Sequence, residues 1–339
     1  MEPLLVVSDR APIPISRAAG VSMEHVQQVE AATAIFRSWD NQYGGGLRRK
    51  AVVGQLSEVV GLLKGPFATP AAGHRMYAAA ADLTQLAGFM SFDLRMHGTA
   101  QQYFLLGLRL AKEAGDRLQA ARMLYCLARQ MIELGQPHAA LDLVQSGLYV
   151  IRRASNARVA AMLHAMEGRA YGGMGDASGC RRAIGRAEEE YVTGDDGEDP
   201  GWVAFFSRAE LAGISGVALR DLALHYLDLK DGQRSRAYAV EARPYITQAA
   251  EGRSKDYLRS QVLDLDGLAV VSFLAGEPDM AVETLNRALD VAAPVSSART
   301  ERNLRRTVRL GQSSYGELPN VQELSERARA TLSPDSEGA

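Results

Sequence analysis

The sequence is poor in the residues that build disulfide frameworks, membrane spans and aromatic cores. Cys126 and Cys180 are the two cysteines among 339 residues and stand far apart, so we expect no disulfide framework and a cytoplasmic location. No apolar run approaches the roughly 20 residues of a membrane-spanning helix, so we expect no membrane span. Aromatic residues make up 6% and hydrophobic residues 47% of the chain, which favours close packing of helices over a sheet.

Motifs for catalysis and metal binding are also missing. The chain has no His-Glu-x-x-His, Cys-x-x-Cys or Gly-x-Ser-x-Gly pattern, and its histidines are scattered. Asp264 and Asp266 stand two apart on a predicted helix and therefore point to different faces. We expect no catalytic residue, no metal site and no cofactor, and hence no enzyme. The net charge of −2 gives no reason to expect a nucleic-acid surface over the whole molecule.

The stretch from Ala121 to Ile151 predicts two amphipathic helices with a sharp turn between them. Gly135 ends the first helix, and Pro137 starts the second at a first-turn position where its missing N–H costs nothing. Small residues stand where the two helices must approach closely, and apolar residues follow at helical spacing. Such a hairpin buries one side and needs a neighbour on the other.

The second helix of this hairpin carries a residue spacing that occurs in five places. A small residue is followed by an apolar residue four later, a small residue three after that and a further residue four later. The five copies begin at Ala100, Ala140, Cys180, Ser235 and Ala281. Another small residue stands twelve positions before each copy, at Gly88, Ala128, Gly168, Ala223 and Ala269. A turn residue stands five positions before each copy, at Arg95, Gly135, Gly175, Lys230 and Gly276.

This spacing resembles the tetratricopeptide repeat, in which small residues let two helices cross closely and a bulky one fills the gap to the next hairpin. The copies are 40, 40, 55 and 46 residues apart, longer than the usual period of about 34, so we expect insertions between repeats. The predicted fold is all-α, a right-handed tetratricopeptide-like solenoid of helical hairpins.

The pattern divides the chain into four segments. We expect an extended leader over 1–22, an N-terminal helical hairpin over 23–66, the array with its C-terminal capping helices over 67–332 and a disordered tail over 333–339. The first hairpin is predicted as helices over 23–39 and 47–63, with a break at 40–46. The array helices are predicted near 72–93, 98–114, 117–134, 137–153, 157–173, 177–191, 206–229, 233–250, 256–274, 278–292, 295–312 and 319–332. The insertion Val192–Phe206 should start as an acidic solvated loop, and its aromatic end should fold back onto the array.

Several further strings occur in an order and spacing that resembles a known family. They are Phe36–Gly46, Leu86–Phe104, Glu198–Trp202, Ala209–Leu211 and Tyr257–Gln261. Together they resemble the C-terminal region of actinobacterial regulators that join a helix-turn-helix of the xenobiotic-response-element type to a tetratricopeptide array. The resemblance covers about residues 23–325 and implies a regulatory, partner-sensing module without an intact DNA-binding domain. The glycine in Glu198–Trp202 departs from the family pattern.

Two N-terminal features have alternative interpretations. Residues 15–30 match the core of a helix-turn-helix, with Gly20 at the bend, which would make the protein a DNA-binding transcriptional regulator. The other interpretation is a solenoid helix capped by Ser22, and it leads us not to expect direct DNA binding. Gly44–Gly46, followed by Arg48–Lys50, is either a backbone nest for an anion or a flexible turn.

The first helices of the repeats should form the inner, concave wall. The predicted groove residues are Gln85, Phe89, Arg122, Tyr125, Arg129, Arg169 and Arg220. Arginines with aromatic residues suit an acidic peptide, a protein segment or a small anion. Alternatively, the arginines are solvated or pair with Asp82 and Asp266. A homodimer is a further predicted assembly.

A second basic cluster, Arg299–Arg309, follows one late helix and lacks interleaved aromatic residues. Its alternatives are a solvated capping helix, a partner surface or a nucleic-acid contact.

Overall fold

The computed structural model describes residues 20–46, 48–154, 156–193 and 199–332. Within these ranges the chain forms fourteen α-helices, one 3₁₀ helix and no β-strand. The elements are α1 (Met23–Tyr43), α2 (Arg49–Leu62), α3 (Pro70–Asp93), α4 (His97–Glu113), α5 (Arg117–Glu133), α6 (Pro137–Ile151), α7 (Ala157–Met174), α8 (Ala177–Thr193), η2 (Gly201–Phe205), α9 (Arg208–Asp228), α10 (Gly232–Gly252), α11 (Leu258–Ala275), α12 (Pro278–Ala292), α13 (Ala298–Tyr315) and α14 (Pro319–Thr331). The all-α class predicted from the sequence is confirmed.

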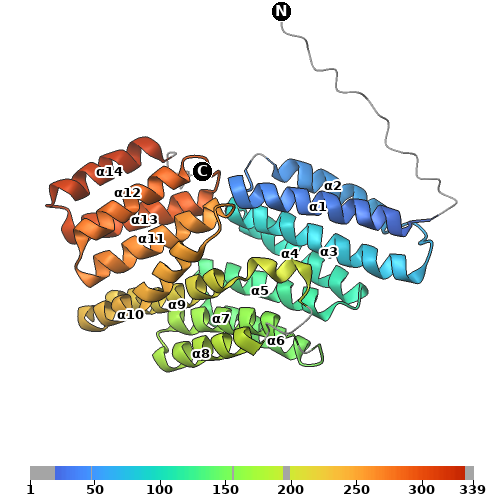
Figure 1. Ribbon diagram of the computed structural model, residues 1–339, viewed down its shortest axis with the longest axis horizontal. Helices are drawn as coiled ribbons and strands as arrows, with labels where there is room; N and C mark the ends of the chain where they lie inside the picture. The colour runs from blue at the N-terminus through green and yellow to red at the C-terminus, as the bar shows by residue number, and fades with distance from the viewer. Residues whose placement is uncertain (1–19, 47, 155, 194–198, 333–339) are drawn as a thin grey trace, which may run out of the picture.

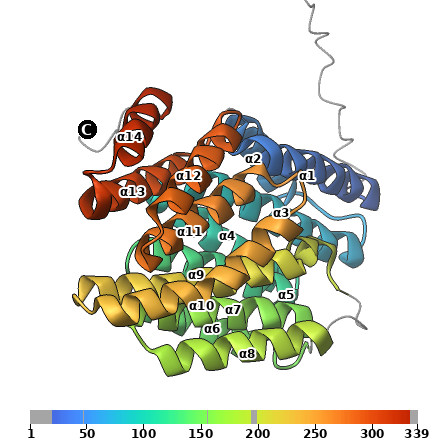
Figure 2. The same cartoon turned by 60° about the vertical axis from the view of Figure 1, so that its left-hand side comes forward.

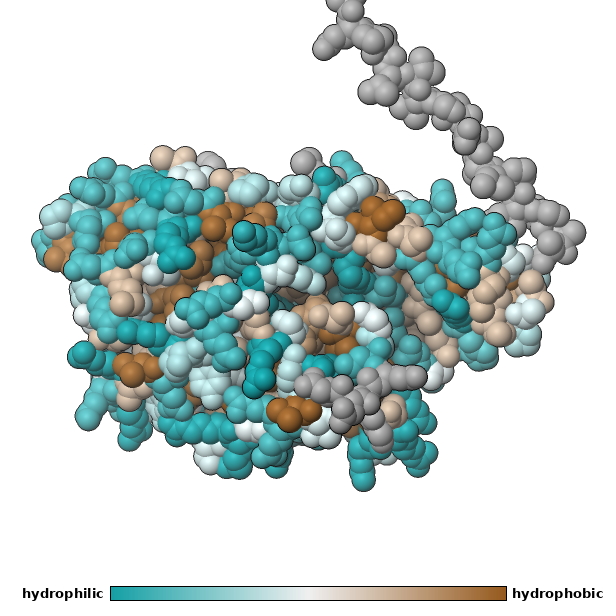
Figure 3. Space-filling view, viewed as in Figure 1, coloured by the Kyte–Doolittle hydropathy of each residue, from teal (hydrophilic) through white to brown (hydrophobic). Residues whose placement is uncertain are grey.

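The helices from α3 to α12 pair into consecutive hairpins, and each hairpin packs on the next. Figure 1 shows this progression, from α1 and α2 through the α5–α8 layer to α13 and α14 at the C-terminal end. Figure 2 shows α10 crossing in front of α6 and α7. In the view of Figure 3, hydrophilic side chains cover most of the surface and hydrophobic ones form small separate patches, because the apolar stripes face neighbouring helices.

The small residues of the repeat spacing lie where two helices cross. Gly88, Ala128, Gly168, Ala223 and Ala269 are all buried. Of the two glycines among them, Gly88 has the tighter fit, since an added Cβ would lie 2.6 Å from Cε1 of Phe104. Phe104 is itself fully buried and belongs to the second helix of the same hairpin. The predicted role of these positions in close helix packing is therefore confirmed.

All five predicted turn residues adopt a left-handed backbone conformation. Their φ angles are 61° at Arg95, 73° at Gly135, 78° at Gly175, 62° at Lys230 and 85° at Gly276. In each turn the next residue donates its N–H to a carbonyl five positions earlier, as Gln136 does to Met131 at 2.8 Å. This is the geometry of a Schellman helix end, which favours glycine but accepts other residues at a cost.

Most helix boundaries lie within two residues of the prediction, and two larger differences have a clear physical cause. α1 continues to Tyr43, and the break predicted from Asp40 was wrong, because Asp40 is buried against Arg259 and its carbonyl accepts the Gly44 N–H at 2.9 Å. α13 begins at Ala298 rather than at 295. Ser297 caps it by accepting the Thr300 N–H on its hydroxyl at 3.2 Å.

The beginning and the end of the array meet. α1 contacts α11, and α3 contacts α13. Four buried side chains join these helices, and we call them the ring-closing cluster: Asp40, Asp93, Arg259 and Arg299. The array therefore closes on itself, and its inner wall is shared by helices from both ends of the chain.

The Gly44–Gly46 turn lies at this closure. The Ser296 N–H donates to the Tyr43 carbonyl at 2.9 Å, and a Cβ on Gly44 would lie 2.4 Å from the Ser296 carbonyl oxygen. Glycine is needed here for a close contact between distant parts of the chain. Neither of the two interpretations of this glycine segment, an anion nest or a flexible turn, predicted its contact with Ser296.

The predicted leader and tail lie mostly outside the described residues, as do residues 15–19 of the helix-turn-helix interpretation. Within the described part, Val21 pairs with the turn after α2, donating its N–H to the Pro66 carbonyl at 2.8 Å. Ser22 and His25 then form a capping box at the start of α1. Among the described helices, none combines the length and the apolarity that a membrane crossing requires.

Candidate functional site

Two adjoining cavities open on the inner wall of the closed array. The larger cavity, of about 820 Å³, lies between α5, α7, α9, α11 and α13. The smaller cavity, of about 450 Å³, lies between α1, α3, α5, η2, α9 and α11. Both are lined by Arg129, Glu210, Ser260 and Arg299, so these residues mark the junction between them. Their volumes fall in the range of ligand-binding sites.

The predicted groove residues are distributed over these two cavities. Gln85, Phe89, Arg122 and Tyr125 line the smaller cavity. Arg169 and Arg220 line the larger one, and Arg129 lines both. The repeat pattern thus placed residues from α3, α5, α7 and α9 around one connected hollow, and their part in binding stays a prediction.

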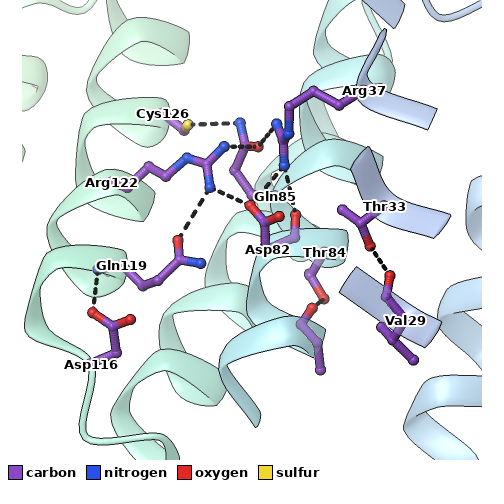
Figure 4. A network of polar contacts seen from close by, with 11 residues as sticks. Val29, Thr33, Arg37, Asp82, Thr84, Gln85, Asp116, Gln119, Arg122 and Cys126 are labelled. Carbon is purple, nitrogen blue, oxygen red and sulfur yellow. Dashed lines mark hydrogen bonds and ion pairs between the residues drawn. The ribbon is translucent and has the colours of Figure 1, made fainter. Parts of the chain in front are cut away.

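Arg122 lies at the centre of a buried polar network (Figure 4). Its side chain is 2% exposed, forms an ion pair with Asp82 and donates to Oε1 of Gln85 at 2.7 Å. Arg37 of α1 donates to the same two residues, at 2.7 Å to Asp82 and 3.0 Å to Gln85. Burial acts to raise the pKa of Asp82, but the two guanidinium groups outweigh it and hold that pKa below its usual value. Arg122 is therefore part of the wall itself. Its pairing with Asp82 is the alternative that the sequence analysis left open.

Arg169 and Arg220 share one carboxylate. Asp221 accepts from Nη2 of Arg169 at 3.1 Å and from Nη2 of Arg220 at 2.7 Å. Burial acts to raise the pKa of Asp221, and the two arginines together lower it. The alternative in which an arginine of the groove pairs with Asp266 was wrong, since Asp266 accepts a hydrogen bond from the Thr307 hydroxyl at 2.6 Å instead. Sequence spacing gave no signal for Asp221, which directly follows Arg220.

The contacts of Arg129 differ from those of Arg122, Arg169 and Arg220. Among the described residues, the carboxylate that pairs with it is Glu210, whose Oε1 lies 3.9 Å away, beyond hydrogen-bond distance, and Glu210 is itself paired with Arg253. Four residues earlier on α5, the buried Tyr125 hydroxyl has no hydrogen-bond partner within the described ranges. Burial raises the pKa of Tyr125 to about 12, so the phenol stays protonated at neutral pH.

The insertion before α9 supplies a wall of the smaller cavity. Most of its acidic start lies at 194–198, outside the described residues, but Asp199 is described and accepts from Nε of Arg158 at 3.2 Å. Phe206 is buried, Trp202 and Phe205 pack on the array, and the Arg122 guanidinium lies 4.8 Å from the Trp202 ring. The predicted return of the aromatic end onto the array is confirmed. The sequence did not assign these aromatic residues to the cavity.

The basic cluster on α13 faces inward. Arg299 is buried and donates to Asp93 at 3.2 Å, and Arg302 donates to Glu133 at 3.2 Å. Arg306 and Arg309 line the larger cavity. Four of its five arginines therefore contribute to the larger cavity, and the interpretation as a solvated face was wrong for the buried Arg299, whereas Arg306 and Arg309 are exposed.

Neither cysteine has the environment of a reactive thiolate. Cys126 and Cys180 form no disulfide, as expected, and both are buried. Burial raises the pKa of both thiols, that of Cys180 to about 12, so both stay protonated. Over the described ranges, no group of His, Cys, Asp and Glu side chains could hold a metal ion.

Comparison with known proteins relates the chain to solved structures alone. No protein-family model and no curated protein sequence matches it. A Rap protein complexed with Competence and Sporulation Factor matches with a TM-score of 0.51 and 11% identity, over 91% of this chain and 87% of that one. NprR in complex with its cognate peptide NprX matches with a TM-score of 0.50 and 16% identity, over 84% and 73%. At such identities the likeness shows the fold, and it confirms the tetratricopeptide-like solenoid.

Proposed function

We propose that the protein is a regulatory module that binds a peptide, or a peptide segment of a protein, in the two adjoining cavities. The observation that carries the proposal is the connected hollow of about 450 and 820 Å³, which the closure of the array forms on its inner wall. Two proteins of similar fold were solved with a bound factor or cognate peptide, which supports the same use of this fold here.

The lining of the cavities suits a peptide. Phe89, Trp202 and Tyr257 contribute aromatic side chains to the lining of the smaller cavity. Arg129 and Ser260 at the junction offer polar groups to a chain that passes from one cavity to the other. A peptide has both apolar side chains and a polar backbone, so a mixed wall can bind it along its length. We propose binding rather than catalysis as the role of this wall.

Regulation would follow from the shape of the array. The ring-closing cluster holds the two ends together, and a ligand that contacts α1, α5, α9 and α11 at once would favour the closed form. Such a shift requires that the ligand bind the closed and open forms with different affinity. We propose that a partner in the cytoplasm, or a second copy of the chain, binds the closed and open forms differently. The protein would then act like the sensor half of a transcriptional regulator.

A peptide-selection experiment tests the proposal. The full chain is incubated with a library of random hexapeptides, and retained peptides are identified by mass spectrometry. Ser260→Trp places an indole at the junction of the cavities, whereas Ser146→Trp places one on the exposed face of α6, outside both. We expect the wild type and Ser146→Trp to retain the same peptides and Ser260→Trp to lose them. Retention by no variant, or equal retention by all three, would contradict binding in the cavities.

A further inference from the structure

Four arginines were predicted on the inner wall, and the structure separates one from the other three. Arg122, Arg169 and Arg220 each donate hydrogen bonds to a wall aspartate, Asp82 or Asp221. In the part of the chain that the structure describes, the Arg129 guanidinium makes no hydrogen bond to protein. Its side chain is 15% exposed and lines both cavities. The N–H groups of the Arg129 guanidinium are therefore available to a ligand at the junction of the two cavities.

A second unused donor lies beside it. Tyr125 and Arg129 are four residues apart on α5 and so share one face of the helix. Tyr125 is 3% exposed, lines the smaller cavity, and its hydroxyl has no partner over the described ranges. A guanidinium has no acceptor, so the phenol cannot donate to Arg129. A buried hydroxyl without a partner is costly, and a ligand acceptor at this point would remove that cost.

The surroundings limit the charge of the ligand. Arg129 stacks on the Phe89 ring, with its Cζ 5.6 Å from the ring centroid, on one side of the junction. Glu210 lies 3.9 Å from the guanidinium and already carries one negative charge. The neighbouring Arg259 and Arg299 pair with Asp40 and Asp93. A planar monoanion fits one guanidinium fork and one hydroxyl, whereas a dianion would be repelled by Glu210.

We propose that Arg129 and Tyr125 bind one carboxylate of the peptide ligand, from its C-terminus or from an aspartate or glutamate side chain. The proposal rests on the peptide-binding function proposed above and specifies its anchor. Arg129 donates two parallel hydrogen bonds to the two carboxylate oxygens, and Tyr125 donates a third. Arg122, Arg169 and Arg220 hold the wall in place and do not contact the carboxylate.

The test uses the random hexapeptide library in two forms, one with free C-terminal carboxylates and one with C-terminal amides. Both are applied to the full-length wild type and to the variants Arg129→Gln, Tyr125→Phe and Arg234→Gln. Arg234 is an exposed arginine on α10 that lines neither cavity, so its variant controls for the loss of one positive charge. Peptides retained by the wild type are then resynthesised, and their dissociation constants are measured.

We expect Arg129→Gln to weaken binding at least about tenfold and Tyr125→Phe about fivefold, with Arg234→Gln unchanged, as for the loss of a charged or a neutral hydrogen bond. A C-terminal anchor requires that amidation abolish retention. A side-chain anchor requires that retained amides contain aspartate or glutamate. Tyr125→Phe should raise the urea midpoint of the free protein slightly, because it removes a buried hydroxyl without a partner and breaks no hydrogen bond within the protein.

The possible failures are distinct. Retention of amidated peptides without acidic residues, or equal binding by the wild type and Arg129→Gln, would overturn the carboxylate anchor and leave the peptide-binding function standing. Retention of no peptide from either library by any variant would overturn the peptide-binding function and the anchor with it.

Discussion

Arg259 donates hydrogen bonds to both carboxylate oxygens of Asp40, which precedes it by 219 residues. The distances are 3.2 Å from Nη1 to Oδ1 and 3.0 Å from Nη2 to Oδ2. Both side chains are buried, and Nη1 of Arg259 also lies 3.6 Å from Asp93. In a repeat array each hairpin normally contacts its neighbours alone. This pair instead links the first helix to the last repeat and makes the inner wall continuous.

The first prediction concerns this link. We expect Arg259→Ala to lower the free energy of unfolding by about 3–5 kcal/mol, because the substitution leaves the buried Asp40 carboxylate without the guanidinium that pairs with it. We also expect a larger radius of gyration, because the ends of the array separate. Urea unfolding and small-angle X-ray scattering measure the two effects.

Arg75 provides the matched control. It also forms a bidentate pair, from Nε and Nη2 to the two carboxylate oxygens of Glu30 at 2.9 and 3.0 Å, but on the exposed surface between α1 and α3. Arg75→Ala should lower the free energy of unfolding by less than about 1 kcal/mol. Equal effects of the two substitutions would show that burial at the ring closure has no special importance.

The repeat architecture was predictable because it depends on local spacing. A small residue at Gly88 or Ala128 and a left-handed turn at Gly135 are needed in every hairpin, whatever the neighbouring hairpins are. Helix ends were harder to predict. α1 extends past Asp40 because of Arg259, a residue of the last repeat, and no local pattern contains that contact.

The candidate site was predictable in part for the same reason. Repeat positions placed Tyr125 and Arg129 on the inner wall without knowledge of the fold's closure. They did not show that Arg169 and Arg220 donate hydrogen bonds to Asp221, or that the Arg122 guanidinium lies over the Trp202 ring. Those partners come from different elements, and their approach depends on the packing of the whole array. The difference between a paired arginine and an available one is therefore a property of tertiary structure.

The second prediction concerns the turn between α9 and α10. Lys230 is exposed and has a φ of 62°, where a Cβ is strained. We expect Lys230→Gly to raise the free energy of unfolding by about 1 kcal/mol, as glycine does at helix ends of this kind. Lys230→Ala keeps the Cβ and should give no gain. Urea unfolding of the two variants measures the difference, and equal stabilities would contradict strain at this turn.

The third prediction contrasts two equivalent glycines. A Cβ at Gly88 would lie 2.6 Å from the Phe104 ring, whereas at Gly168 its closest contact is Cγ1 of Ile184 at 3.4 Å. We expect Gly88→Ala to destabilise the protein by about 1–3 kcal/mol through overpacking. Gly168→Ala should stabilise it by about 0.5–1 kcal/mol, because alanine loses less backbone entropy in a helix. Thermal or urea unfolding tests the opposite signs, and a loss of stability in both variants would refute the contrast.

The fourth prediction concerns the pH dependence of stability. Burial raises the pKa of Asp264 to about 6, although Arg253 donates to it at 2.8 and 3.0 Å, and the neighbouring Glu210 carboxylate adds to the increase. The Asp264 carboxylate therefore takes up a proton near pH 6 in the folded state, whereas in the unfolded state it does so near the ordinary aspartate pKa of 3.8. Because the folded state holds more protons between these values, the contribution of Asp264 to stability rises as the pH falls through 6.

Asp264→Asn removes this proton and should remove the associated pH dependence. From pH 7 to pH 5 we expect the wild type to gain roughly 1 kcal/mol of unfolding free energy relative to Asp264→Asn, since one pKa unit corresponds to about 1.4 kcal/mol. Other titrating groups are common to both proteins and cancel in the difference. Urea unfolding at the two pH values measures it. An unchanged difference, or one of the opposite sign, would mean that Arg253 keeps the Asp264 carboxylate charged across this range.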